Sequence, residues 1–178
     1  MNLLGIDFED WYHPELVQKY VRTKKEPTII NGIDKIIDIL SKNDTYATFF
    51  VVGELLEHRP ELLDKILANG HEIGFHTMHH TRIDLLHQDA FIEELETFNR
   101  LTKGKSKGFR APTFSINQKS SWAIDMLSDH GYTYDSSIVP VKTGMYGIAN
   151  AEERPYKISR TSLEKNRSEE HTSELQSR

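Results

Sequence analysis

The sequence contains no cysteine among its 178 residues, which excludes disulfide bonds and thiolate metal sites. Any bound metal ion would need histidine, aspartate or glutamate side chains as its protein ligands. The absence of cysteine also fits a reducing compartment without requiring one. With 37% hydrophobic and 28% charged residues, the composition is that of a globular domain.

Long runs of basic residues and long runs of apolar residues are missing as well. The formal net charge is -5, and no run of lysine and arginine forms a basic patch, so nothing favours nucleic acid as a partner. No apolar run approaches the ~20 residues that a membrane span needs. The first residues turn acidic early and show neither the basic nor the apolar part of a signal peptide. We therefore expect a cytoplasmic protein with no membrane span.

Strand-like apolar runs alternate with helix-like patterns along the chain. Branched and aromatic residues at 46–53 predict a strand, and isoleucines at helical spacing within 31–44 predict a helix. By the same signals, further strands are expected at 2–7, 71–76, 107–112 and 132–137. Further helices are expected at 59–70, 89–104 and 118–131. This alternation predicts an α/β domain with a parallel sheet or barrel.

The polar C-terminal segment 167–178, RSEEHTSELQSR, breaks the alternation. The string resembles the translation of a common sequencing adapter, with a genuine polar tail as the alternative. We therefore expect the domain to span 1–166, truncated at its C-terminal end, and 167–178 to be a non-native tail.

Carboxylates follow the first predicted strand in the segment GIDFEDWYH, which contains Asp7, Glu9 and Asp10. The carboxyl ends of the strands form the active edge of parallel α/β folds. Carboxylates gathered there repel one another unless a cation or an arginine lies nearby. The segment therefore indicates a charged site, with an exposed acidic turn or the cap of a helix starting near Pro14 as the alternatives.

A cluster of histidines, His76, His79 and His80, lies within the segment GFHTMHH. His76 and His80 stand four positions apart, so on a helix or in a tight turn both rings can face one ion, whereas His79 faces elsewhere. Two imidazoles and one carboxylate would leave coordination positions open, as in catalytic sites. The alternatives are surface histidines, or one core histidine with two exposed ones.

Two later strand ends carry further charged residues. Arg110, in FRAPTF, precedes a loop stiffened by proline and is placed to pair with and orient one of the acids after the first strand. An ordinary surface ion pair, which would stabilise little, is the alternative. Asp135, in YDSS, follows the last predicted strand, where a plain turn is an equal alternative.

Taken in order, the segments IDFED, ATFFVVG, NGHEIGFHTMHH, GFRAPTF and GYTYDSS resemble the polysaccharide deacetylases, the NodB-homology family also called carbohydrate esterase family 4. The similarity runs from about Leu3 to Val139, and the form DFEDW is similar to the branch associated with exopolysaccharides. The resemblance implies an incomplete, distorted (β/α) barrel with its site at the carboxyl ends of the strands.

The resemblance also implies one divalent metal ion, with zinc as the expected ion, held by an Asp-His-His triad. His76 and His80 are then the histidine ligands, and Asp10 is the predicted carboxylate ligand. Glu9 is the rival of Asp10, because the alternation of a strand puts Glu9 on the same side as Asp7.

The implied reaction is metal-assisted hydrolysis that removes N-acetyl groups from an amino-sugar polysaccharide such as chitin, an exopolysaccharide or peptidoglycan. Asp7 is the expected base, Arg110 orients it, and the backbone N–H of Thr113 stabilises the oxyanion. The leaving-group acid of the family, a late histidine, has no counterpart, because the only histidine after Asp135 is His171 in the adapter-like tail. We therefore expect the intact protein to be active and this fragment to be weak or inactive.

Two other functions stay open at this stage. One is an amidohydrolase on the same fold that opens a small cyclic amide, and the other is a non-catalytic domain that binds a metal or a glycan. Four aromatic residues are candidates for a sugar-stacking rim, although such side chains are more often core: Trp11, Tyr12, Phe114 and Tyr146.

Overall fold

The computed structural model describes residues 3–22, 26–141, 143–149, 151–160 and 163. Its strands form one five-stranded sheet in the order β1-β2-β3-β4-β5. The strands are β1 (Gly5–Phe8), β2 (Thr48–Val51), β3 (Glu72–Phe75), β4 (Gly108–Phe109) and β5 (Tyr134–Asp135). The predicted tail at 167–178 lies outside the described residues.

Each strand pairs in parallel with the strand that follows it in the sequence. Parallel neighbours need a crossover connection, and such crossovers are nearly always right-handed. The unbroken order therefore winds the chain in one direction, as in a barrel, without the reversal of a doubly wound sheet. The predicted parallel α/β fold is confirmed, and the five strands described form an open sheet, as expected of an incomplete barrel.

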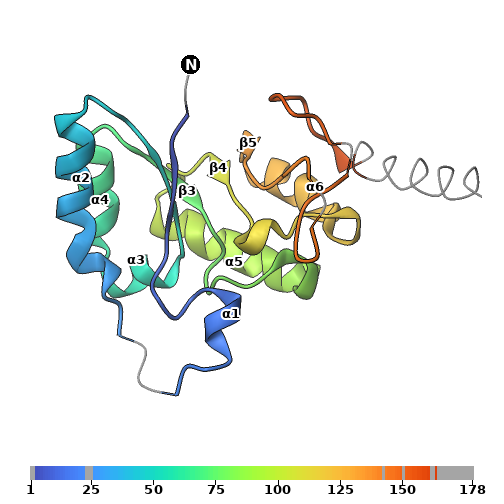
Figure 1. Cartoon of the computed structure of the whole chain (residues 1–178), viewed down its shortest axis with the longest axis horizontal. Helices are drawn as coiled ribbons and strands as arrows, with labels where there is room; N and C mark the ends of the chain where they lie inside the picture. The colour runs from blue at the N-terminus through green and yellow to red at the C-terminus, as the bar shows by residue number, and fades with distance from the viewer. Residues whose placement is uncertain (1–2, 23–25, 142, 150, 161–162, 164–178) are drawn as a thin grey trace, which may run out of the picture.

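Helical segments fill the connections between the strands. In chain order they are α1 (Glu15–Gln18), η1 (Ile29–Gly32), α2 (Ile33–Lys42), α3 (Glu54–His58), α4 (Glu61–Ala68), η2 (Ile83–Leu85), α5 (Gln88–Leu101), η3 (Pro112–Phe114), η4 (Gln118–Ser120) and α6 (Trp122–Asp129). Figure 1 shows α2 and α4 side by side on one side of the sheet, where Lys65 Nζ lies 2.6 Å from Asp34 Oδ1. None of the described helices combines the length and apolar character that crossing a membrane demands.

The core lies between the sheet and these helices. The ring of Phe75 on β3 lies 4.5 Å from that of Phe98 on α5 and 5.6 Å from that of Phe109 on β4. Burial of each large apolar side chain stabilises the fold by ~1.5–3 kcal/mol. The central strands are therefore a firm base for the loops at their carboxyl ends, and their fully buried side chains include Phe49, Val51, Ile73, Phe75 and Phe109.

The short helix α3 is the main element that the sequence patterns missed. It starts directly after Gly53, where a Cβ atom would lie 2.2 Å from the sulfur of Met78. Only glycine permits this close approach. As a result, the start of α3 packs against the histidine-rich loop, and the backbone N–H of Gly53 donates to the carbonyl of Thr77 at 2.9 Å.

His71 lies at the edge of the sheet opposite the carboxyl ends of the strands, just before β3. Its ring packs against Phe49 at 5.3 Å and Tyr46 at 6.2 Å, and the residue is 6% exposed. Neither ring nitrogen has a hydrogen-bond partner among the described residues. Burial lowers the pKa of His71 below its ordinary value, because the charged ring would lose its hydration.

Substitution of His71→Phe should therefore flatten the acid dependence of stability. A histidine with a lowered pKa in the folded state stabilises the fold above the unfolded pKa of about 6.5, and this contribution is lost as the pH falls, because the unfolded chain takes up the proton first. We expect the free energy of unfolding to drop less between pH 7 and pH 5 in the variant than in the wild type, as measured by urea denaturation. His58→Phe, at an exposed position of α3, is the control, and parallel profiles for wild type and His71→Phe would contradict the prediction.

Candidate active site

Glu9, His76 and His80 come together at the carboxyl ends of β1 and β3. One ligand atom from each of the three side chains lies within 4.8 Å of the others. His80 Nε2 is 2.8 Å from Glu9 Oε2, and the two histidine rings lie 5.0 Å apart at 68°. The predicted histidine pair is thus brought together with a carboxylate, and that carboxylate belongs to Glu9.

The protonation of His76 is fixed by its backbone neighbour. Its Nδ1 lies 2.6 Å from the carbonyl oxygen of Arg110, and a carbonyl only accepts, so Nδ1 carries the proton and Nε2 keeps its lone pair. Burial lowers the pKa of His76 to about 4, so the ring is neutral at pH 7. Glu9 Oε2 is buried, and its contact at 2.8 Å with His80 Nε2 is the one that would be exchanged for a cation; His80 Nδ1 is buried without a hydrogen-bond partner among the described residues. A neutral imidazole nitrogen and a carboxylate oxygen together fit a divalent cation.

The predicted carboxylate ligand, Asp10, is used elsewhere. Its side chain is buried, and Oδ2 accepts hydrogen bonds from the backbone N–H groups of Ile29, at 2.7 Å, and Thr28. Oδ1 accepts from the hydroxyl of Thr28 at 2.9 Å. Asp10 thus holds the loop before α2, while Glu9, on the same side of the chain as Asp7, lies beside the histidines, which favours Glu9 over the predicted Asp10 as the candidate carboxylate ligand.

Asp7 and Arg110 form the pair that the strand ends predicted. Arg110 Nη1 donates to Asp7 Oδ1 at 2.7 Å, and Nη2 donates to the hydroxyl of Ser136 at 2.8 Å. The guanidinium also lies over the ring of Phe50, 4.2 Å from its centre. A Cβ atom on Gly5 would lie 2.6 Å from Arg110 Nη2, so the glycine in β1 leaves room for the arginine. These contacts fix the orientation of the Asp7 carboxylate.

A carboxylate on α3, Glu54, joins the acidic loop to the histidine loop. Glu54 Oε1 accepts from Tyr12 Oη at 2.9 Å and from His13 Nε2 at 2.8 Å, and Oε2 lies 3.2 Å from His79 Nδ1. Burial alone would raise the pKa of Glu54, but these hydrogen bonds lower it below its ordinary value. Among the three predicted histidines, His79 is therefore the bystander, with a mostly exposed side chain.

His13 is a buried partner that the motif reading did not assign. Its Nδ1 accepts from the backbone N–H of Asp10 at 2.7 Å, so its Nε2 carries the proton that it donates to Glu54. The ring stacks beside that of His80 with centres 6.2 Å apart. His13 and Glu54 thus support the loops that carry Glu9 and His80. No local sequence signal marks Glu54, which looks like an ordinary acid in the first turn of a helix.

Strained backbone is concentrated around this site. Thr77, His80, Thr113 and Phe114 all have left-handed φ values, of 59°, 56°, 53° and 49°. A branched residue such as threonine rarely adopts this conformation, which costs about 1–3 kcal/mol per residue. The turns that carry the histidines and the predicted oxyanion donor are therefore held in shape by the packing around them.

A cleft of about 230 Å³ opens above these groups. Asp7, Glu9 and the two histidines line it together with Ala111, and further lining residues come from α1, η3 and the segment that follows β5. The lining residues are Asp7, Glu9, Pro14, Glu15, Leu16, His76, His80, Ala111, Thr113, Phe114 and Met145.

Asp135 braces the cleft from behind and does not line it. Its carboxylate accepts from the backbone N–H of Ser137 at 2.9 Å and from the Ser137 hydroxyl at 2.6 Å. The Ser137 hydroxyl in turn accepts from the backbone N–H of Ala111 at 2.7 Å. Burial raises the pKa of Asp135 to about 6. This relay holds the loop after β4, which carries Thr113.

The aromatic candidates divide between core and cleft. Tyr12 is buried at 1% exposure, whereas Trp11 is 46% exposed. Phe114 lines the cleft, and the ring of Tyr146 lies 5.6 Å from that of Phe114. His171, the last histidine of the sequence, lies outside the described residues.

Two bacterial deacetylases are similar in sequence to part of this chain. A peptidoglycan-N-acetylglucosamine deacetylase of Bacillus cereus is 32% identical over 118 residues, which cover 57% of this chain and 43% of the relative. A peptidoglycan-N-acetylmuramic acid deacetylase of Bacillus subtilis is 33% identical over 89 residues, which cover 45% of this chain and 34% of the relative. The chain thus spans less than half the length of these relatives.

Solved structures share the fold. A family 4 carbohydrate esterase from Streptomyces lividans, in complex with acetate, is 18% identical with a TM-score of 0.56, over 77% of this chain and 62% of that one. A family 4 pseudoenzyme from Bacillus anthracis is 20% identical with a TM-score of 0.57, over 75% of this chain and 41% of that one. The family model for polysaccharide deacetylases matches residues 28–134. Together with the parallel sheet and the order of its motifs, this match shows that the chain belongs to the polysaccharide deacetylase family.

Proposed function

We propose that the intact protein is a metal-dependent hydrolase that removes N-acetyl groups from an amino-sugar polysaccharide. The observation that carries this proposal is that Glu9, His76 and His80 line one cleft together with Asp7, whose carboxylate is paired with Arg110. Relatives named as deacetylases of peptidoglycan and of chitooligosaccharides support the substrate class.

Glu9, His76 and His80 would hold one divalent ion, with zinc as the expected ion. Two imidazoles and one carboxylate are a ligand set that zinc accepts, and three protein ligands leave coordination positions open toward the cleft. When bound, such an ion polarises the acetyl carbonyl and lowers the pKa of a bound water.

The remaining steps belong to side chains of the chain itself. Arg110 holds Asp7 Oδ1, so the second carboxylate oxygen of Asp7 is the one that can accept the proton of the attacking water. The backbone N–H of Thr113, which lines the cleft, would donate to the oxyanion of the tetrahedral intermediate. The amine then needs a proton to leave. Among the described residues that line the cleft, the histidines are the two proposed ligands, so Asp7, which holds the proton of the water, is the group placed to return it to the amine.

A non-catalytic domain that binds a metal or a glycan is the competing function, and a structural neighbour is itself a pseudoenzyme. The competing function gives no reason for the Asp7–Arg110 pair, because binding an ion through Glu9, His76 and His80 does not need it. An amidohydrolase that opens a cyclic amide would use the same groups, and a comparison of linear and cyclic amide substrates separates the two activities.

The choice between Glu9 and Asp10 as the carboxylate ligand is tested by matched substitutions one residue apart. Glu9→Gln should weaken zinc binding by more than the roughly 10–100-fold typical of losing a residue that only supports a ligand. Asp10→Asn keeps an acceptor oxygen for the loop and should leave the affinity close to that of the wild type while it lowers stability. Both are measured by calorimetric titration of the metal-free protein, and the opposite order of affinities would restore Asp10 as the ligand.

The role of Asp7 is tested by Asp7→Asn, which keeps the shape of the side chain but removes its basicity. We expect deacetylation of N-acetylglucosamine oligomers, measured by release of acetate, to fall by about 10²–10⁴-fold. The affinity of the variant for zinc should stay within about twofold of the wild-type value. Loss of the metal would instead make Asp7 a ligand, and unchanged turnover would remove it from the reaction.

A further inference from the structure

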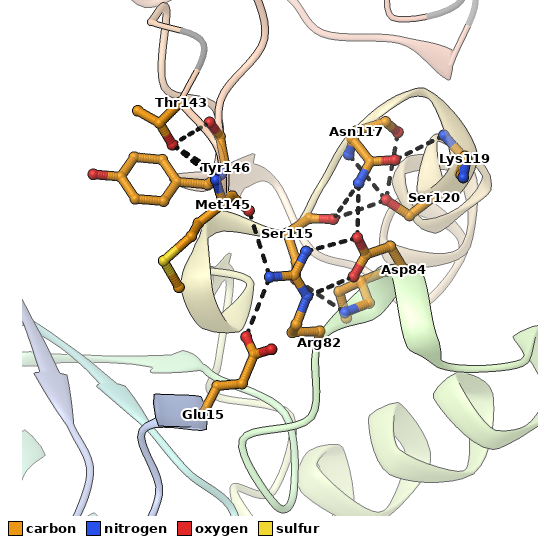
Figure 2. Close-up of polar contacts among 11 residues, drawn as sticks. Glu15, Arg82, Asp84, Ser115, Asn117, Lys119, Ser120, Thr143, Met145 and Tyr146 are labelled. Atoms are coloured by element: carbon orange, nitrogen blue, oxygen red, sulfur yellow. Dashed lines mark hydrogen bonds and ion pairs between the residues drawn. The ribbon is translucent and has the colours of Figure 1, made fainter. Parts of the chain in front are cut away.

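Arg82 lies at the rim of the cleft and contacts three separate parts of the chain. Figure 2 shows its guanidinium between Asp84 on one side and Glu15 and Met145 on the other. Nε and Nη2 donate to the two oxygens of Asp84 at 2.9 and 2.8 Å. Nη1 donates to Glu15 Oε2 at 3.2 Å and to the backbone carbonyl of Met145 at 3.4 Å. The forked guanidinium allows all of these bonds at once.

The Asp84 side of Arg82 is anchored to the core. Asn117 Nδ2 donates to Asp84 Oδ2 at 3.1 Å, and the backbone N–H of Ile83 donates to the hydroxyl of Ser115 at 3.0 Å. Ile83 is completely buried. The guanidinium therefore projects from a fixed base, and the Arg82 side chain is only 17% exposed.

In the wall that follows β5, the turn 143–146 makes few other hydrogen bonds to the rest of the chain. Thr143 Oγ1 accepts from the backbone N–H groups of Met145 and Tyr146 at 3.2 and 3.0 Å and donates to the carbonyl of Tyr146 at 2.9 Å. These bonds close the turn on itself. Within the described part of the chain, the bond from Arg82 is the only hydrogen bond that joins the turn 143–146 to a distant segment. The ring of Tyr146 adds the contact with Phe114.

The other wall, α1, follows the buried His13, and Gln18 Nε2 donates to the carbonyl of His13 at 2.6 Å. This four-residue helix buries none of its residues. Its Leu16 is 62% exposed and lines the cleft, as does Met145, which is 42% exposed. The ion pair between Glu15 and Arg82 ties α1 to the same guanidinium that holds the turn 143–146. The two apolar walls of the cleft mouth thus share a tie to one side chain that does not itself line the cleft.

We propose that Arg82 is a positioning residue that sets the width of the cleft mouth, and through it the size of the N-acyl group on the sugar that the cleft admits. This inference rests on the proposed deacetylase function for its substrate, but the positioning of the walls is independent of any reaction. Loss of the guanidinium frees α1 and the turn 143–146, widens the mouth and weakens the grip on a small acetyl group.

Hydrogen exchange tests the positioning without any need for activity. In Arg82→Lys, which keeps the charge but loses the fork, amides of 14–18 and 143–148 should exchange about three- to tenfold faster while core strands stay protected. Glu15→Gln cuts only the tie to α1 and should speed exchange at 14–18 alone. If Arg82→Lys opens the whole fold, the exchange result for Glu15→Gln decides whether the tie between Arg82 and α1 positions that wall. Arg59→Lys, at an exposed ion pair with Glu61, is the matched control. Unchanged exchange in both wall segments overturns the proposal.

Kinetics test the consequence for substrate size. Arg82→Lys should raise the KM for N-acetylglucosamine oligomers by about three- to tenfold and leave kcat within about twofold of the wild-type value. The reason is that the walls bind the substrate equally in the ground state and in the transition state. The ratio of N-propionyl to N-acetyl turnover should rise. A fall in kcat at constant KM, or an unchanged acyl preference, overturns the role in specificity. Absence of turnover in the wild type would match the weak activity expected of this fragment, and the exchange result then decides by itself whether Arg82 holds the walls.

Discussion

The site depends on the way one residue, Arg110, is used at both its backbone and its side chain. Its backbone N–H donates to the carbonyl of Phe75 at 3.0 Å, which extends the pairing of β3 and β4 past the ends of the strands. Its carbonyl accepts a hydrogen bond from His76 Nδ1–H, and its guanidinium donates to Asp7. The geometry of a proposed ligand and that of the proposed base are therefore both set by the register of a two-residue strand.

That register is stable because the sheet beneath it is packed with aromatic side chains. Phe75 contacts aromatic rings on both a neighbouring strand and α5. Above this packed layer, the loops adopt conformations that are unfavourable in isolation, with Thr77 in the histidine loop and Thr113 in the cleft lining at positive φ. The core supplies the free energy that keeps these turns in place, which is the usual relation between a scaffold and a strained site.

Much of the site could be predicted from the sequence because parallel strands bring their carboxyl ends to one edge. The spacing of His76 and His80 was enough to select them over His79, and the pairing of Arg110 with Asp7 followed from two neighbouring strand ends. The choice between Glu9 and Asp10 could not be made locally. It depends on backbone N–H groups at 28 and 29, which only the folded loop brings to Asp10.

The other omissions have similar causes. The helix α3 has only five residues, too few to show a helical period, and Gly53 reads equally well as the end of a strand. Glu54 acquires its partners only when α3 packs against two distant loops. Arg82 shows no pattern with Glu15 or Met145, because the contacts join segments separated by 67 and 63 positions.

The backbone and the side chain of Arg110 have separate roles, and this separation bears on how the functions of proteins with this fold could diverge. The carbonyl that fixes His76 is present whatever side chain stands at this position, whereas the hold on Asp7 needs the guanidinium. A single substitution at position 110 could thus uncouple cation capture from hydrolysis and leave a scaffold that still loads its ion. In such a descendant, a bound metal ion would not indicate hydrolytic activity. The orientation of the Asp7 carboxylate would decide whether the protein hydrolyses its substrate.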